Sequence, residues 1–281
     1  DVWVTNSFID ASDDAICFKS HDATKMCENI TVRNCVARSS ANGIKFGTVT
    51  SGGYKNIRII NNKVYDSYRS ALTIATPDGG VIEDILVDSL EAYNTGNALY
   101  LRIGARWNKG QAGSMNNITI QNFTCEIPAG KPDAGYEYEG PVEDLPRNVS
   151  PASIVGIPGH DITNVTLRNI RIVYPGGSNP HYAFRGIKPA DLDSIPEMEA
   201  AYPEFSQFKE LPAWGFYVRH AQNVTFENVT LTALDKEYRP AVVLHQVEGA
   251  SLRNVHYVEP GANRKKQLHI YQSSGIRQMN Q

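Results

Sequence analysis

The sequence lacks several features that would place it at once in a common functional class. Its 281 residues carry 27 Lys and Arg against 30 Asp and Glu, and no basic run exceeds Arg264-Lys265-Lys266. Nucleic acids bind to strongly basic surfaces, so we expect no nucleic-acid partner. No apolar run approaches the ~18 residues of a membrane-spanning helix, so we expect no membrane span.

Motifs of cofactor-dependent enzymes are also missing. There is no phosphate-binding loop, no dinucleotide fingerprint, no Gly-x-Ser-x-Gly elbow and no HExxH. Cysteine is scarce, and the four cysteines form neither a paired CxxC metal site nor a disulfide scaffold. We therefore predict no metal and no cofactor, and buried free thiols at Cys17, Cys27, Cys35 and Cys125.

What the sequence does contain is an internal repeat of about 28 residues. An aliphatic residue that follows an Asn-like position recurs at Val2, Ile30, Ile57, Ile85, Ile118, Val165, Val224 and Leu252. Several intervals are 27 or 28 residues, and the longer ones predict loop insertions at about 126–151 and 174–213. A repeat of this kind indicates one supersecondary unit that stacks on its neighbours.

Each unit predicts short strands rather than helices. Apolar and polar residues alternate with a period of two in the repeat motif and in a second segment, at 15–19, 43–47, 71–75, 98–102, 215–219 and 241–245. Propeller blades need ~40 residues for four strands, so 28 residues favour a coil of stacked parallel strands. We predict an all-β, single-domain parallel β-helix over 1–281, with about seven or eight rungs. The chain begins inside a strand, so we expect that it is truncated at its N-terminus and that an upstream part supplies earlier rungs.

Seven Asn-x-Ser/Thr sequons are present, and six fall inside the strand pattern. There the Asn suits a bend and its amide can pair with the next rung, so we favour a structural role over glycosylation. The seven are Asn29, Asn117, Asn122, Asn148, Asn164, Asn223 and Asn228.

The second segment assigns its residues to two faces. One parity should fill the coil: Ile16, Phe18, Ile44, Phe46, Leu72, Ile74, Leu99, Leu101, Phe216, Val218, Val242 and Leu244. The other parity predicts an exposed outer stripe of Cys17, Lys19, Lys45, Thr73, Ala75, Tyr100, Arg102, Tyr217, Arg219 and His245. This stripe mixes cations with tyrosines and has no acid, which favours binding of acidic sugars; an ordinary solvated sheet face is the alternative.

Two adjacent carboxylates, Asp13 and Asp14, precede the second segment of the first rung. The equivalent positions on later rungs are Asn42, Ser70 and Asn97, so only this rung carries acids here. Asp-Asp is also common in solvated turns. Beside a cationic, aromatic stripe it is a candidate acid/base pair.

Three further features are weaker candidates. His160 follows a Gly-Ile-Pro-Gly turn where the stripe would cross the fifth rung, and it is either a sugar ligand or a turn residue without a role. Arg106 and Trp107 form an Arg-aromatic pair that suits a sugar acid or caps the coil. The two insertions, which include Tyr136, Tyr182 and Tyr202, are expected to form lids or walls, to pack on the coil or to mediate self-association.

The stretch from Val2 to Lys19 resembles glycoside hydrolase family 28, the polygalacturonase-like right-handed parallel β-helix enzymes. Its strand followed by Asp13-Asp14 is similar to that family's paired-Asp motif, and the likeness is clear to about Asn122. The resemblance implies a right-handed coil and an inverting hydrolase, with Asp13 and Asp14 as two of its catalytic acids.

The chain also differs from that family. The family's first acidic motif would precede Asp1. Asn42 stands where its Gly-His-Gly motif has His, and Thr73 and Ala75 stand where its Arg-Ile-Lys motif has cations. We infer that Lys45 and Arg102, on the flanking rungs, supply charge to the same groove.

The sequence therefore predicts a polygalacturonase-type glycosidase that acts on an acidic, pectin-like polysaccharide or oligosaccharide. A non-catalytic glycan-binding or structural β-helix is the alternative, and a polysaccharide lyase is the second. The catalytic candidates are Asp13 and Asp14; the substrate-binding candidates are Lys19, Asn42, Lys45, Thr73, Tyr100, Arg102, Arg106 and His160. We expect a monomer or weak oligomer that is extracellular or periplasmic, because polymeric pectin is extracellular.

Overall fold

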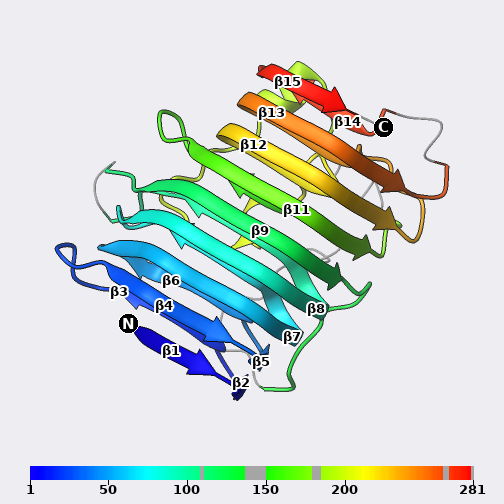
Figure 1. The fold of residues 1–281 in the computed structure, drawn as a ribbon. Helices are drawn as coiled ribbons and strands as arrows, with labels where there is room; N and C mark the ends of the chain where they lie inside the picture. The colour runs from blue at the N-terminus through cyan, green and yellow to red at the C-terminus, as the bar shows by residue number, and fades with distance from the viewer. Residues whose placement is uncertain (108–110, 137–149, 179–184, 262–265, 280–281) are drawn as a thin grey trace.

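The computed structural model describes residues 1–107, 111–136, 150–178, 185–261 and 266–279, and these are nearly all in strands and the turns that join them (Figure 1). Its strands are β1 (Val2–Thr5), β2 (Phe8–Ala11), β3 (Ile16–Ser20), β4 (Cys27–Arg33), β5 (Val36–Ser39), β6 (Ile44–Thr50), β7 (Gly53–Thr76), β8 (Val81–Ile103), β9 (Ser114–Glu126), β10 (Ala152–Val155), β11 (Ile162–Tyr174), β12 (Phe216–Ala233), β13 (Val242–Val258), β14 (Leu268–Tyr271) and β15 (Ser274–Met279).

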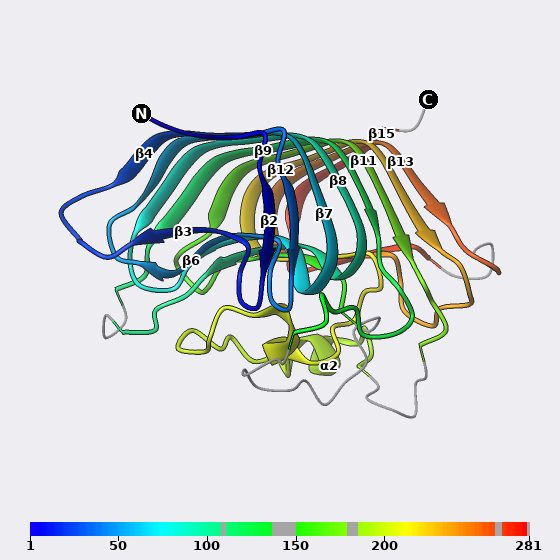
Figure 2. The same cartoon turned by 90° about the horizontal axis from the view of Figure 1, so that it is seen from below.

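Every pairing between these strands is parallel, and each joins a segment to its counterpart one repeat later. Ile30 pairs with Val2 and Ile57, for example, and Ile44 pairs with Ile16 and Leu72. The segments that carry the candidate site stack in the order β3, β6, the end of β7, the end of β8, β10, the start of β12, the start of β13, and β14. The 28-residue repeat is therefore one turn of a stacked coil, as the turns in Figure 2 show.

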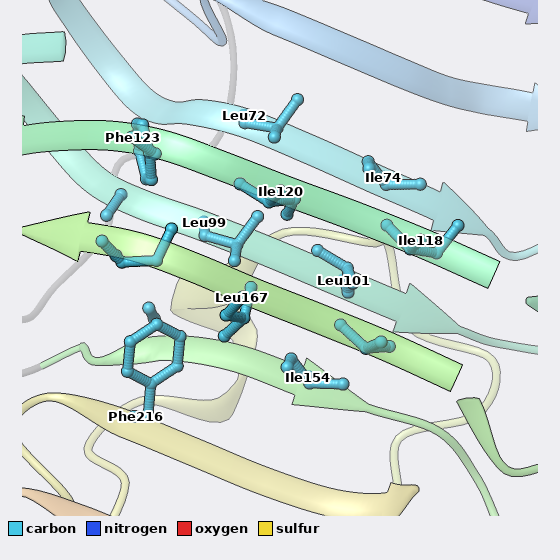
Figure 3. Packing of buried hydrophobic residues seen from close by; sticks show 14 of the residues in the cluster. Leu72, Ile74, Leu99, Leu101, Ile118, Ile120, Phe123, Ile154, Leu167 and Phe216 are labelled. Atoms are coloured by element: carbon cyan, nitrogen blue, oxygen red, sulfur yellow. The ribbon is translucent and has the colours of Figure 1, made fainter. Parts of the chain in front are cut away.

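The interior of the coil is a continuous apolar core. All twelve residues whose parity predicts that they fill the coil belong to it, and Figure 3 shows how Leu72, Leu99 and their neighbours stack rung upon rung. Burial of these aliphatic side chains is the main favourable contribution to the free energy of folding. Alternation thus predicts the inward face correctly.

Asparagines turn the chain at the corners of the coil. Asn122, Asn169 and Asn228 have φ near +54°, and the Asn169 amide donates to Asn122 Oδ1 at 2.9 Å while Asn228 donates to Asn169 at 3.1 Å. Asn tolerates this left-handed conformation better than most residues. Six of the sequon asparagines have such positive φ values, at Asn29, Asn117, Asn122, Asn164, Asn223 and Asn228, and Asn148 lies outside the described residues.

The second insertion forms a layer over one face of the coil. It contains helix α2 (Pro189–Asp193) and the 3₁₀ turn η2 (Phe205–Phe208), which lie below β3 and β6 in Figure 2. A second apolar cluster joins this layer to the outer side chains of the stacked strands: Tyr100, Val155, Leu192, Ile195, Phe205, Phe208, Leu211, Ala213, Tyr217 and Val243. Residues 179–184 of this insertion, and 137–149 of the other, lie outside the described ranges.

This layer overturns the expectation of an exposed stripe. Lys19 is exposed and Cys17 half-buried, but the rest of the stripe is at most 5% exposed: Lys45, Thr73, Ala75, Tyr100, Arg102, Tyr217, Arg219 and His245. These side chains do point away from the core of the coil. They are buried because the insertion packs on them.

All four cysteines are free, as predicted, but burial holds only for Cys35 and Cys125; Cys17 and Cys27 are partly exposed. Within the described ranges, no helix has the length and apolar character needed to cross a membrane.

Candidate functional site

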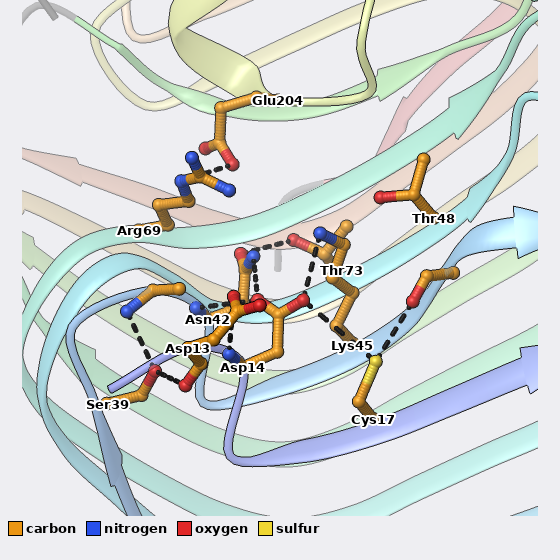
Figure 4. A network of polar contacts seen from close by, with 12 residues as sticks. Asp13, Asp14, Cys17, Ser39, Asn42, Lys45, Thr48, Arg69, Thr73 and Glu204 are labelled. Atoms are coloured by element: carbon orange, nitrogen blue, oxygen red, sulfur yellow. Dashed lines mark hydrogen bonds and ion pairs between the residues drawn. The ribbon is translucent and has the colours of Figure 1, made fainter. Parts of the chain in front are cut away.

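The paired acids lie at the corner that leads into β3, where parallel stacking brings equivalent positions of successive rungs together. The Asn42 backbone N–H and side-chain amide both donate to Asp14 Oδ1, at 3.1 and 2.7 Å. Thr73 Oγ1 and the Ser70 backbone N–H then donate to Asn42 Oδ1, at 3.0 and 3.2 Å. Figure 4 shows this network, in which three of the residues predicted from the sequence meet.

Asp14 also forms a buried ion pair. Its Oδ2 lies 3.0 Å from Lys45 Nζ, and the two side chains are 7% and 1% exposed. Burial alone would lower the pKa of Lys45, but the negative charge of Asp14, the Tyr202 phenol oxygen that accepts from Lys45, and the charge of Glu204 hold that pKa above its ordinary value. The ammonium is therefore a fixed positive charge in the site.

Cys17 lies beside this pair as a structural donor. Its thiol donates to the Gly47 carbonyl at 3.0 Å and lies 3.9 Å from Asp14 Oδ2. Burial, assisted by the Asp14 charge, raises the pKa of the thiol to about 11. Since only the thiolate is a strong nucleophile, Cys17 is unsuited to covalent catalysis.

Asp13 differs from Asp14 in being exposed to solvent. Its Oδ1 accepts the Asp14 backbone N–H at 2.8 Å, and its carbonyl accepts the Ser39 hydroxyl at 2.6 Å (Figure 4). These bonds fix the turn and leave the second carboxylate oxygen, Oδ2, without a hydrogen bond from any described residue. Asp13 can therefore exchange a proton with a molecule bound at the surface.

Tyr202, from the insertion, is a second partner of the Lys45 ammonium. Lys45 Nζ donates to its phenol oxygen at 3.1 Å and Thr48 Oγ1 donates at 3.0 Å. Tyr202 is 40% exposed, so its ring reaches the surface. Burial acts to raise its pKa, but Lys45, Thr48 and Arg69 outweigh that effect, and the pKa of Tyr202 lies below its ordinary value.

Two arginines flank the Tyr202 ring. The guanidinium carbons of Arg69 and Arg106 lie 5.7 and 5.9 Å from its centroid. Arg106 binds Asp78 with two bonds of 3.1 Å and lies 4.8 Å from the centroid of Trp107, which is 70% exposed.

Arg69 has a carboxylate partner too. Its Nε lies 3.2 Å from Glu204 Oε2, and both side chains are buried (Figure 4). Arg69, Lys45 and Arg106 are therefore each paired with an acid. The three cations contribute a fixed positive electrostatic potential to the site and are not free to bind an acidic ligand.

Two predicted binding residues do not belong to this site. Arg102 donates to the backbone carbonyls of Gly156, Glu197 and Met198, at 3.1, 2.6 and 2.9 Å, so it holds the insertion in place. Tyr100 is 2% exposed in the apolar cluster under the same layer. The inference that Arg102 charges the same groove as Lys45 is therefore wrong.

His160 lies in an exposed turn after β10, where it pairs with Ile157 through the backbone. Within the described ranges, no hydrogen bond or ion pair connects it with Asp13 or Asp14. Lys19 lies on β3, the strand that follows the corner with Asp13 and Asp14, and its side chain is exposed.

Sequence reasoning missed Arg69, Asp78 and Glu204, and named Tyr202 only as part of an insertion. Arg69 lies two residues before the alternating segment 71–75 and carries no pattern of its own. Tyr202 and Glu204 come from a stretch with no repeat signal; a Tyr-Pro-Glu run in a long insertion was the sole cue.

No family model matches this sequence, and no curated protein matches it. A solved structure with similarity is that of a family 28 exopolygalacturonase of Yersinia enterocolitica, with a TM-score of 0.49 and 17% sequence identity. The match covers 89% of this chain and 36% of that enzyme's chain, so this chain spans little more than a third of its length.

Proposed function

We propose that the chain is a right-handed parallel β-helix glycoside hydrolase of the polygalacturonase type, which acts on an acidic, pectin-like polysaccharide or oligosaccharide. The observation that carries the proposal is the acid corner. An exposed carboxylate, Asp13, adjoins a buried one, Asp14, which is held by Asn42 and Lys45. Hydrolysis of a glycosidic bond needs a proton-exchanging carboxyl at the surface of a rigid frame, and this corner supplies one.

The two acids take different roles in this proposal. Asp13 exchanges a proton with substrate or water, because it is exposed and one of its oxygens, Oδ2, carries no hydrogen bond from the described residues. Asp14 accepts from Asn42 through Oδ1 and pairs with Lys45 through Oδ2, so it orders the site and balances its charge. Preorganised charges of this kind stabilise the charge that develops as the glycosidic bond breaks.

The surface around the corner suits an acidic sugar. Trp107 offers an exposed indole beside the Arg106 guanidinium, and Lys19 is an exposed cation on β3. Aromatic faces stack on the apolar faces of sugar rings, while a cation offsets the charge of a uronate. Because such polymers occur outside the cytoplasm, we propose an extracellular or periplasmic location.

The test is turnover of pectin-derived substrates by the protein and by Asp13→Asn. We expect the natural chain to release reducing ends from a uronic-acid glycan, and Asp13→Asn to lose ~10²–10⁴-fold in rate with its unfolding midpoint unchanged. Asp235→Asn is the matched control. Asp235 is also exposed, and its Oδ1 accepts the backbone N–H of the next residue at 2.7 Å, as that of Asp13 does at 2.8 Å.

Lack of activity on every uronic-acid glycan tested would refute the proposed function. Equal activities of Asp13→Asn and Asp235→Asn would remove Asp13 from the mechanism.

The main alternative is a glycan-binding protein without turnover. The exposed Trp107 favours it, because an exposed indole can stack on a sugar ring without any catalysis. Saturable binding of oligogalacturonides, reduced by Trp107→Ala and without release of reducing ends, would establish that function. A lyase, the second alternative, would leave an unsaturated sugar that absorbs in the ultraviolet.

A further inference from the structure

Glu210 is a buried acid that lies outside the acid corner. It follows η2 and precedes β12, in the layer that the second insertion forms, and it is 2% exposed. Within the described ranges, neither of its carboxylate oxygens accepts a hydrogen bond, although both are buried. Almost all buried polar groups of proteins have such a partner, so this carboxylate needs an explanation.

Two arginines lie near Glu210, but both direct donors elsewhere. Arg239 donates from Nε and Nη2 to the carboxylate of Glu237, each at 3.0 Å, and from Nη1 to the Leu211 carbonyl at 3.1 Å. Arg185 Nε donates to the backbone carbonyl of Glu210, at 2.8 Å, and not to its carboxylate. The Glu237 carboxylate would also repel a second negative charge here.

The neutral form of Glu210 suits these surroundings, because a buried anion without a donor is costly. Burial raises the pKa of Glu210 to about 7. Arg239 and Arg185 oppose this shift, and the Glu237 charge adds to it. On the same segment, the adjacent Lys209 is exposed.

The segment around Glu210 holds the layer on the coil. Phe208 and Leu211, on either side of it in the sequence, belong to the apolar cluster that joins the layer to the stacked strands. The same layer supplies Tyr202, which accepts a hydrogen bond from Lys45 at 3.1 Å. A change that loosens this segment therefore reaches the acid corner.

We propose that Glu210 is a proton-operated switch: its protonated carboxyl lets the layer seat on the coil, and loss of the proton to solvent loosens the layer and its contact with Lys45. The inference does not depend on the proposed hydrolase function. It concerns the layer that covers the outer side chains of the coil, whatever the chain binds there.

The direction of the switch follows from proton linkage. The seated layer keeps a proton on Glu210 that the opened layer releases between the ordinary value of 4.5 and about 7. The seated state is therefore favoured at low pH and loses stability as pH rises through that window.

The experiment is hydrogen exchange of the backbone amides at 189–211, which reports how often the layer opens. It compares the natural chain with Glu210→Gln, which is neutral at every pH. The opening equilibrium of the natural chain divided by that of the variant should rise ~10–10²-fold between pH ~5 and ~8, because the interval from 4.5 to about 7 sets the upper limit. The ratio cancels the effects of other titrating groups, including His245 under the same layer.

Glu248→Gln is the matched control, because Glu248 is an exposed acid on β13, outside the layer. The same ratio for this variant should not change with pH. Glu210→Met is a second neutral variant that should behave as Glu210→Gln does, and it decides the question if the glutamine amide itself disturbs the layer. A ratio that is independent of pH for both neutral variants would overturn the proposal.

A second measurement follows the link to the acid corner. The Lys45 side chain is 1% exposed and bonded to Tyr202, so an amine-modifying reagent reaches it when the layer opens. At pH ~8 we expect Lys45 to react at least ~10-fold more slowly in Glu210→Gln than in the natural chain. Lys63, which is 56% exposed, should react equally in both and serves as the internal reference. Equal rates at Lys45 would overturn the proposed effect on the acid corner.

Discussion

Removal of the Lys45 ammonium tests whether the acid corner is held by a buried ion pair. Lys45 Nζ and Asp14 Oδ2 are 3.0 Å apart, and their side chains are 1% and 7% exposed. At an effective dielectric constant of ~20, two unit charges at this distance attract by about 5–6 kcal/mol. The desolvation of both charges offsets much of this attraction, so the pair adds little net stability.

Breaking the pair is a different matter, because Lys45→Met leaves Asp14 as a buried anion. We expect the free energy of unfolding to fall by about 3–5 kcal/mol. The double variant Lys45→Met/Asp14→Asn should recover most of that loss, since no charge is then left without a partner. The assay is denaturant unfolding of the four members of this double-mutant cycle.

The Lys63–Glu91 pair provides the control, since its charged atoms are also 3.0 Å apart but its side chains are 56% and 62% exposed. Solvent screens exposed pairs, so Lys63→Met should barely change the unfolding midpoint. If Lys45→Met and Lys63→Met had equal effects, or if the double variant were no more stable than Lys45→Met, the reasoning from burial would be refuted.

Two further predictions concern stability. Burial, with the charges of Arg219 and His220, lowers the pKa of His245 to about 4, so the folded chain binds fewer protons than the unfolded chain between pH ~6.5 and ~4. The contribution of His245 to the free energy of unfolding should therefore fall as pH drops through that window. Thermal unfolding measured across the window should show a smaller fall in His245→Gln than in the natural chain, and equal falls in the two would contradict this prediction. The second prediction concerns the corner residue Asn169, which has a φ of 54°. Asn169→Ala should lower the free energy of unfolding by about 1 kcal/mol more than Asn169→Gly does, because Ala resists the left-handed conformation and Gly does not. Denaturant unfolding measures the difference, and equal losses would show that only the side-chain hydrogen bonds matter.

The 28-residue period was sufficient to predict the stacking that forms the acid corner. Parallel strands in register place equivalent residues of neighbouring turns one above the other, so Asp14, Asn42 and Ser70 had to lie close together. The same period predicted which side chains fill the coil, because alternation fixes the side of the strand to which each residue points.

Alternation did not predict what covers the outer side. Lys45, Arg102 and His245 point outward as expected, yet the insertion buries them. A period of two identifies a face, but burial of that face depends on whether another part of the chain packs on it.

The sequence by itself therefore determined the repeat, the parallel stacking, the inward residues and the place of the paired acids, because each follows from local periodicity. Tertiary structure alone decided that Tyr202 meets Lys45 across 157 residues of sequence. It also decided that Glu204 balances Arg69. An insertion without a repeat has no register to fix its partners, so its contacts are set by packing of Leu192, Phe205 and Phe208 on the coil.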